Sequence, residues 1–453
     1  MISCRTQVLD RGPDCGYDDP MTIILLLAFM AVIGAGYWLK YLNLSHLKVH
    51  GHTVPPEFVG AVDPATLAKI SDYTVENSRF GLIESLIDNA VLIAFLFLGL
   101  LGIYDEWIAS LTGSFLGNGV LFFLVLTVAQ TIMGIPFSLY RNFRIENKYG
   151  FNTMTVKLWL TDLVKGLAIG AVISTLMVLG ALWLVSASPD LWWLWVWLFF
   201  LVVGIFMMYI SPTLIEPLFF KFEPLKVEGL EERIRTLMEK AGLKVSRVFQ
   251  VDASRRSRHS NAYFTGIGKV KRIVLFDTLL EQMTQDEILA VLAHEVGHWK
   301  KKHVLKRIIM TEAMAFCGIV AAYWLLQGSW LPNIIGLADA SFYAKAVILG
   351  FLLSIVTFPL TPLFSYLSRR DERESDRFAA DLTGGTEAMA SALVKLSKEN
   401  LSNLHPHPLY AAFYYSHPPV VERIRQLKQQ STDRQRTDRQ RTDSQTADRH
   451  TRG

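Results

Sequence analysis

Residues 191–210 read LWWLWVWLFFLVVGIFMMYI, a stretch of twenty residues without a charged side chain. A helix of about 20 apolar residues is long enough to cross the hydrocarbon core of a bilayer, which is roughly 30 Å thick. A buried helix of a large soluble protein is the alternative, and the absence of any charge over this length argues against it. The stretch therefore predicts a transmembrane helix.

Six further apolar runs of similar length surround this one, so we expect an α-helical multi-pass membrane protein with seven spanning helices. They cover approximately residues 21–40, 82–104, 120–140, 158–186, 308–327 and 346–367. The 453 residues are 51% hydrophobic and 19% charged, which excludes a disordered chain. Three cysteines exclude a disulfide scaffold, and a net charge of +4 is too small to indicate a nucleic-acid partner.

The basic residues of the loops predict the orientation, because cytoplasmic loops near the spans are enriched in Lys and Arg. Residues 105–119 and 187–190 contain neither. The alternate loops contain Lys48, Lys69, Arg79, Arg141, Arg144, Lys148 and Lys157. We therefore expect the N-terminus outside and the C-terminus inside. The plain architecture without an organelle signal favours a bacterial cytoplasmic membrane, and the lack of a clean cleavage site predicts that the first span is retained as an anchor.

Two polar segments divide the chain further. Residues 221–307 follow the first five helices (21–220), and residues 368–430 follow helices six and seven (308–367), so both segments lie on the cytoplasmic side and are expected to form one domain. Residues 1–20 are a polar tail. Residues 431–453 repeat a Thr-Asp-Arg-Gln-Arg unit with almost no apolar residue and are expected to be disordered.

The first polar segment predicts an α+β domain. Residues 229–241 have the period of an amphipathic helix, and residues 248–251 read as a strand. Residues 261–265 and 272–276 read as a hairpin. Thr284, with Glu287 three residues later, forms a capping box that predicts a helix through about residue 302.

That last helix contains Val291-Leu292-Ala293-His294-Glu295-Val296-Gly297-His298. Residues at i and i+4 share a helix face, so His294 and His298 can bind one Zn²⁺ while Glu295 faces the bound water. Zinc lowers the pKa of such a water to about 7, and a carboxylate can take its proton as it attacks a carbonyl. Because chance also produces this spacing, the helix cap that precedes it matters to the interpretation. Two surface histidines on a helix are the alternative.

A catalytic zinc needs a third protein ligand, and residues 368–378 offer four carboxylates directly after the seventh span. If this segment is helical, Glu372 and Asp376 lie on one face, where one binds the metal and the other orients a ligand imidazole. A solvated, ion-paired helix start is the alternative, and spacing alone does not choose among the four. They are Asp371, Glu372, Glu374 and Asp376.

Two other segments are candidates for the active site. Asn261, Ala262 and Tyr263 begin a strand whose free edge could pair with an extended peptide, although an ordinary paired strand is an equal alternative. His417 precedes two prolines and a helix that carries Arg423, and a cation near the zinc stabilises the oxyanion that forms when water attacks. A histidine at a helix start without catalytic function is the alternative for His417.

Five motifs in this order resemble the type I CAAX prenyl endopeptidases, the Ste24-like integral membrane zinc metalloproteases of family M48. The resemblance covers nearly all of residues 21 to about 428, and it predicts that Met21 is the natural start. It implies seven helices around a large water-filled chamber with a zincin-like domain on the cytoplasmic side, Glu372 as the third ligand and Asp376 as its neighbour. The motifs are His294-Glu295-x-x-His298, Ser368-Arg369-Arg370-x-Glu372-x-x-x-Asp376, Ser257-x-His259-x-Asn261-Ala262-Tyr263, Glu146-Asn147-Lys148-Tyr149-Gly150-Phe151-Asn152 and Tyr415-Ser416-His417-Pro418-Pro419.

The sequence thus favours a zinc metalloendopeptidase with one Zn²⁺ per chain and Glu295 as general base. In the family, such enzymes remove C-terminal residues after a prenylated cysteine. The expected partners are a peptide or protein substrate, prenylated or not, and the lipid bilayer. A protease of membrane-protein quality control with little prenyl dependence is the alternative. A transporter with a structural metal is less favoured, because Glu295 would have no task and closed zinc sites favour Cys.

Overall fold

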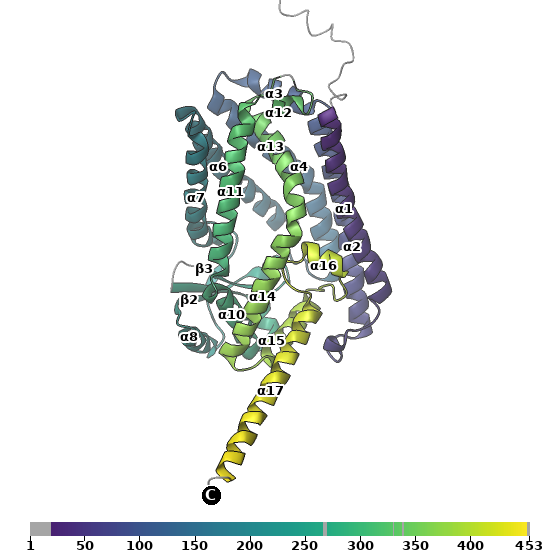
Figure 1. Ribbon diagram of the computed structural model, residues 1–453, viewed down its shortest axis with the longest axis vertical. Coiled ribbons are helices and arrows are strands. Elements are labelled where there is room, and N and C mark those ends of the chain that lie inside the picture. The colour runs from purple at the N-terminus through teal and green to yellow at the C-terminus, as the bar shows by residue number, and fades with distance from the viewer. Residues whose placement is uncertain (1–19, 266–269, 329, 338, 451–453) are drawn as a thin grey trace, which may run out of the picture.

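The computed structural model describes residues 20–450 apart from 266–269, 329 and 338. Seven of the described helices are long and apolar enough to cross a membrane, which agrees with the sequence prediction. The long axes of these helices run side by side (Figure 1). They are α1 (Pro20–His50), α2 (Pro64–Phe97), α4 (Phe115–Tyr140), α6 (Val156–Ala187), α7 (Trp192–Ile210), α11 (His303–Gln327), and α13 (Phe342–Thr357), which continues into α14 (Thr361–Thr383).

The second span differs from its prediction. Asp63 caps α2 by accepting a hydrogen bond from the Thr66 amide at 2.6 Å, and α2 ends at Phe97, where 82–104 was expected to be one helix. Gly99 has a φ of +78°, a left-handed conformation that glycine adopts without strain. The helix is interrupted at this glycine, and a separate helix, α3 (Leu100–Leu111), follows.

The membrane helices enclose a chamber, as expected for this fold class. No more than 17% of the residues in any apolar window are buried, so most of these side chains are available to lipid or to the space between the helices. Buried apolar residues gather instead near the two ends of the bundle. One group includes Leu101, Phe122 and Leu331 beside α3 and the short helix α12 (Trp330–Asn333), and another includes Phe58 and Ile424.

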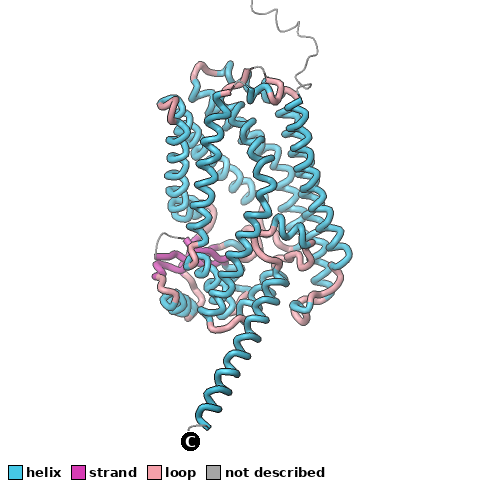
Figure 2. The backbone as a smooth tube through the Cα atoms, in the orientation of Figure 1, coloured by secondary structure: helices cyan, strands magenta, loops and turns pink. Residues whose placement is uncertain are grey.

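The polar segments fold into an α+β unit at one end of the membrane helices, where the strands lie together (Figure 2). Four strands are ordered β1-β2-β4-β3, so β3 lies at an edge. Strands β2 and β4 are parallel, and β3 pairs with β4 antiparallel as the predicted hairpin requires; its turn lies outside the described residues. The strands are β1 (Phe222–Pro224), β2 (Lys244–Val251), β3 (Ala262–Thr265) and β4 (Val270–Phe276).

The helices of this unit surround one central helix, α10. The predicted amphipathic helix is α8, and buried side chains of α8, β4 and α10 form one apolar core. α10 packs against α8, β3, α14 and α15, so both polar segments of the sequence meet on it. The helices are α8 (Leu230–Lys240), α9 (Asp277–Gln282), α10 (Gln285–Lys300), α15 (Glu387–Glu399) and α16 (Pro408–Tyr414), with α5 (Asn147–Tyr149) near the end of α4.

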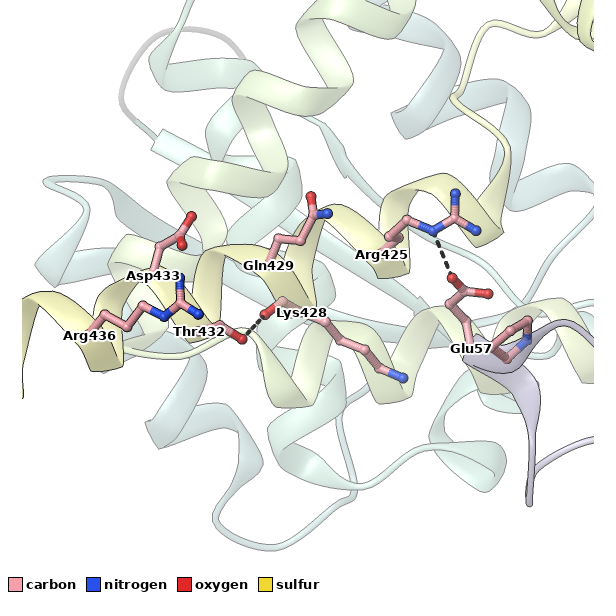
Figure 3. A pocket seen from close by; sticks show the side chains of 8 residues that line it. Glu57, Arg425, Lys428, Gln429, Thr432, Asp433 and Arg436 are labelled. Atoms are coloured by element: carbon pink, nitrogen blue, oxygen red, sulfur yellow. Dashed lines mark hydrogen bonds and ion pairs between the residues drawn. The ribbon is translucent and has the colours of Figure 1, made fainter.

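The C-terminal helix α17 (Val420–His450) is where the structure departs most from expectation. Its start is held to the rest of the protein by Arg425, whose Nε lies 2.9 Å from Glu57 (Figure 3). We expected disorder from residue 431, but the helix continues to residue 450 and projects from the body (Figure 1). Arg and Gln in the repeat have good helix propensity, and no Gly or Pro interrupts it before the end of the helix. Residues 1–19, the expected polar tail, lie outside the described residues.

Candidate metal centre and active site

Helix α10 begins at the predicted capping box. The Thr284 amide donates to Glu287 at 2.8 Å, and the Thr284 hydroxyl accepts from the Glu287 amide at 3.4 Å. The buried Glu287 carboxylate also accepts hydrogen bonds from Ser391 at 2.6 Å and Lys395 at 2.7 Å, both on α15. Burial by itself raises the pKa of Glu287, but these partners outweigh it and lower the pKa. The cap therefore also joins the first polar segment to the second.

Helices α10 and α14 cross very closely at Gly297. A Cβ atom at this position would lie 2.9 Å from the Cα of Ser375, a distance that real Cβ atoms essentially never show. Gly297 belongs to the His294–His298 motif, and the structure explains this glycine: it lets the backbone of α14 approach α10. This approach brings the carboxylates of α14 up to the histidines of α10.

Three side chains converge at this crossing. The Nε2 atoms of His294 and His298 are 3.1 Å apart. Glu372 Oε2 lies 3.3 Å from His294 Nε2, and Glu372 Oε1 lies 3.1 Å from His298 Nε2. His294 and Glu372 are 5% and 4% exposed. Helix α14 is continuous through residue 383, so the condition that the segment be helical is met.

This arrangement fits a metal ion. Ligand atoms around a tetrahedral zinc, at 2.0–2.1 Å from the metal, are separated from one another by roughly 3.3 Å, close to the separations observed. Two imidazoles and a carboxylate are the donors that a catalytic zinc uses. Burial by itself lowers the pKa of His294, but contacts with Asp376 and Glu372 outweigh it and raise the pKa to about 9. The pocket therefore favours a positive charge at its centre.

Asp376 and Arg423 form a second layer behind His294. Asp376 Oδ1 lies 2.8 Å from His294 Nδ1. Arg423 donates to both oxygens of Asp376, from Nε at 2.9 Å and from Nη2 at 2.6 Å. All three side chains are buried. A carboxylate on Nδ1 keeps the proton there and leaves the Nε2 lone pair free for a metal.

His417 and Glu295 border the centre on its more open side. His417 Nδ1 lies 2.7 Å from Glu372 Oε2, and its side chain is 63% exposed. Glu295, the residue after His294 on α10, is only partly buried. Arg423 Nη1 lies 3.8 Å from Glu372 Oε2. The predicted residues of α10, α14 and the 415–423 region are therefore all neighbours in space.

The four carboxylates of residues 371–376 separate into two pairs. Glu372 and Asp376 face His294, whereas Asp371 and Glu374 face His303. His303 was not among the residues predicted from the sequence, because its spacing from His298 falls outside the i, i+4 pattern. The residue is 2% exposed, and its Nδ1 lies 3.2 Å from His298 Nδ1.

The predicted substrate-binding residues lie at the edge of the sheet. Asn261 immediately precedes β3, and its side chain accepts a hydrogen bond from the Ala262 amide at 2.8 Å. The Tyr263 hydroxyl donates to Glu216 at 2.6 Å, near the end of the fifth membrane helix. Strand β3 packs against α10, so this edge is adjacent to the helix that carries His294 and His298.

The two remaining motifs meet each other away from the metal centre. His259 Nε2 lies 3.3 Å from Glu146, and His259 Nδ1 lies 3.0 Å from Asn400. The imidazole also stacks on Phe151, with ring centroids 4.0 Å apart. Burial by itself lowers the pKa of His259, but these two hydrogen bonds outweigh it and raise the pKa. The motifs thus form a joint between the membrane helices and the polar domain.

Known proteins match this chain along most of its length. A family model for the CAAX prenyl protease N-terminal region, described as five membrane helices, matches residues 43–221, and the model for peptidase family M48 matches residues 224–431. A CAAX prenyl protease 1 homolog from Arabidopsis thaliana is 36% identical, over 86% of this chain and 93% of the relative. CAAX prenyl protease 1 from Saccharomyces cerevisiae is 34% identical, over 86% and 90%. The crystal structure of S. mikatae Ste24p superposes with a TM-score of 0.84 at 30% identity, covering 90% of this chain and 99% of that one.

Proposed function

The chain belongs to the CAAX prenyl protease family within peptidase family M48, and from this premise we propose that it is a zinc endopeptidase that cleaves near a prenylated cysteine at the C-terminus of its substrate. It is a multi-pass membrane metalloprotease. The relatives are named as CAAX prenyl proteases, and the proposal extends their substrate class to this chain. The observation that carries it is the convergence of His294, His298 and Glu372 within a few ångströms of one another.

His294, His298 and Glu372 are the proposed ligands, with one zinc ion per chain. Zinc in such a site supplies a Lewis acid that acidifies water and polarises a carbonyl. Asp376 holds the Nδ1 proton of His294, which keeps Nε2 available as a ligand. Arg423 holds Asp376 in place through two hydrogen bonds.

Glu295 is the proposed general base. It follows His294 on α10 and is partly exposed, so its carboxylate can accept a proton from the attacking water. The same group can then return that proton to the amine that leaves when the peptide bond breaks. A positioned general base contributes typically 10²–10⁴-fold in rate, so removing the charge of Glu295 is the sharpest test of this assignment.

His417 and Arg423 are the proposed cations for the oxyanion. His417 is exposed toward the open side of the centre and is free to donate once a substrate carbonyl replaces its present contact with Glu372. Arg423 is buried and is held by Asp376, so it adds positive charge on the side of Glu372 and Asp376 without a direct contact to the substrate. His417 is therefore the direct donor in this proposal, and Arg423 acts mainly through the field.

Asn261, Ala262 and Tyr263 are the proposed binding edge for the substrate. In the described part of the sheet, β3 pairs with β4 on one side only, which leaves backbone groups for an extended peptide. Its packing against α10 supports the placement of a peptide bond beside the two histidines.

We also propose that the active site faces the cytoplasm, with the N-terminus outside. The support is the excess of Lys and Arg in alternate loops. In a cysteine-free background, Glu239→Cys on the exposed face of α8 should react with a membrane-impermeant maleimide in inside-out vesicles. If the new cysteine reacted only in right-side-out vesicles, the proposed orientation would be wrong and the active site would face outward. The bacterial origin stays a prediction.

The decisive experiment compares matched peptides that end in a prenylated or an unprenylated cysteine motif. Purified protein in detergent should cleave the prenylated peptide, and a zinc chelator should abolish cleavage. Glu295→Gln should keep its zinc and lose about 10²–10⁴-fold in rate, while the exposed Glu239→Gln control should behave as the parent. Cleavage by Glu295→Gln at the parent rate would refute the mechanism. Equal cleavage of both peptides would favour the quality-control alternative.

A further inference from the structure

His303 stands at the tight connection between α10 and α11. Helix α10 ends at Lys300 and α11 begins at His303, and Lys302 between them has a φ of +57°. A residue other than glycine rarely adopts this left-handed conformation, and residues strained in this way tend to occur at functional sites. The turn directs the buried imidazole of His303 back against His298. The strained conformation of Lys302 therefore occurs together with a contact between these two histidines.

That contact is between two ring nitrogens. His303 Nδ1 lies 3.2 Å from His298 Nδ1. Two lone pairs at this distance repel and so do two protons, so the stable arrangement has one proton between the rings. The Ser375 hydroxyl approaches the same His303 nitrogen at a longer 3.5 Å. The direction of the bond between the two imidazoles therefore depends on which tautomer His298 adopts.

A metal at the proposed site fixes that tautomer. His298 meets His294 and Glu372 through Nε2, so Nε2 must present its lone pair and Nδ1 must carry the proton. His298 then donates to His303 Nδ1. The proton of neutral His303 lies on Nε2, which is 3.1 Å from Glu374 Oε2 and 3.7 Å from Asp371 Oδ1. The distances from His303 to His298 and to Glu374 agree with this single chain of donors, whereas Asp371 lies beyond hydrogen-bond reach and contributes only its charge.

We infer that His303 is a positioning residue that accepts from His298 Nδ1, orients that ring and favours the tautomer that the metal requires, while Glu374 accepts from its far side. The inference rests on the proposed zinc site. Metal-bound histidines usually donate their second N–H to a carboxylate or a carbonyl. Asp376, 2.8 Å from His294 Nδ1, is placed to accept that proton directly. For His298 the corresponding carboxylate is that of Glu374, and His303 lies between the two.

A second metal ion is the competing interpretation of the same cluster. His303 Nε2, Asp371 Oδ1 and Glu374 Oε2 are close enough to share an ion, and Asp371 Oδ1 is buried without a hydrogen bond. Such an ion would move the His303 proton to Nδ1, where it would oppose the Nδ1 proton of His298. Lys301 also lies 3.2 Å from Glu374, and Arg370 lies 3.9 Å from Asp371. Both cations disfavour a metal there.

Paired substitutions test the positioning role. Asn carries its polar group near the place of Nδ1 and can accept from His298, whereas Gln carries its polar group near the place of Nε2. We expect His303→Gln to raise the zinc dissociation constant about 10–100-fold and His303→Asn to restore most of that loss. The readout is competition for zinc by a chromogenic chelator, with zinc counted per chain by elemental analysis. His405→Gln, at a histidine that contacts the Thr53 carbonyl, is the control and should bind zinc as the parent does.

Glu374→Gln serves as a second variant in case His303→Gln does not fold, because the Glu374 side chain is 40% exposed. It should weaken zinc binding roughly three- to tenfold, since it acts one group further away. Parent-like affinity in both His303→Gln and Glu374→Gln would overturn the inference. So would equal losses in His303→Asn and His303→Gln, or a second zinc per chain that His303→Gln removes.

The same assay separates this inference from the proposed function. If His294→Gln binds zinc as tightly as the parent, the proposed metal site itself is wrong. If His294→Gln loses zinc and the His303 variants do not, only the positioning role fails.

Discussion

Two histidines in this protein meet a glutamate at the same distance and with different consequences. His294 Nε2 lies 3.3 Å from Glu372, and His259 Nε2 lies 3.3 Å from Glu146. At His259 the other ring nitrogen meets the Asn400 oxygen, so both partners are acceptors, and the protonated ring can donate to both. At His294, Asp376 is placed to accept a hydrogen bond from Nδ1, which leaves Nε2 to share a zinc ion with a second imidazole and a carboxylate. Converging lone pairs distinguish a metal centre from a hydrogen-bonded joint, and distance alone does not.

The largest expected effect comes from exchanging the two glutamates for glutamine. Glu372→Gln replaces a carboxylate ligand with an amide, so zinc affinity should fall by at least about 100-fold, the upper range for changes behind the ligands. Glu146→Gln should keep its zinc, because that side chain only accepts hydrogen bonds from Tyr73 and His259. Zinc content after dialysis measures both. If Glu146→Gln lost its zinc and Glu372→Gln kept it, the metal would belong to the His259–Glu146 contact and not to the His294–Glu372 centre.

Gly297→Ala tests whether the close approach of α10 and α14 creates the centre. The new methyl group would meet the backbone of Ser375, so we expect a loss of about 1–3 kcal/mol in stability together with faster zinc release. Thermal unfolding in detergent and chelator competition measure the two effects. Gly318→Ala on α11 is the control, because a Cβ atom there meets nothing within 4 Å. Equal effects of the two substitutions would remove the special role of the crossing.

Glu287→Gln should destabilise the link between α10 and α15. The buried carboxylate loses its charge while Lys395 remains, so we expect a loss of about 1–3 kcal/mol. Since the folded-state pKa of Glu287 is lowered, its contribution is present above the unfolded pKa and is lost as pH falls through the folded value. Unfolding should therefore become less sensitive to acid in the variant. The exposed Glu281→Gln is the control, and equal acid sensitivity in parent and variant would contradict the assignment.

The smallest expected effect belongs to the joint at His259. Its folded-state pKa is raised, so protonated His259 stabilises the fold below the unfolded value of about 6.5 and this stability is lost as pH rises through the folded value. Because the side chain is 40% exposed, we expect less than about 1 kcal/mol. Melting temperatures of the parent and His259→Gln should converge as the pH rises past this range. A difference that grows with pH would show that His259 is neutral in the joint.

Much of the fold could be predicted from local patterns. Long apolar runs indicated seven spans, Thr284 and Glu287 indicated the start of α10, and two short strand-like runs close in sequence indicated the β3–β4 hairpin. The break at Gly99 was missed because apolar composition continues through it, and only the backbone conformation interrupts the helix. The parallel pairing of β2 with β4 was also missed, since strands distant in sequence leave no local signal of their partners.

For the candidate site, the sequence by itself determined that His294 and His298 share one face of a helix, because helical periodicity is a local property. It offered four carboxylates in residues 371–376 and no means to choose among them by spacing. Only the tertiary structure divided them, turning Glu372 and Asp376 toward His294 and the other two toward His303. The physical reason is that this choice depends on how two helices remote in sequence cross at Gly297, and a crossing is a property of packed surfaces rather than of either helix alone.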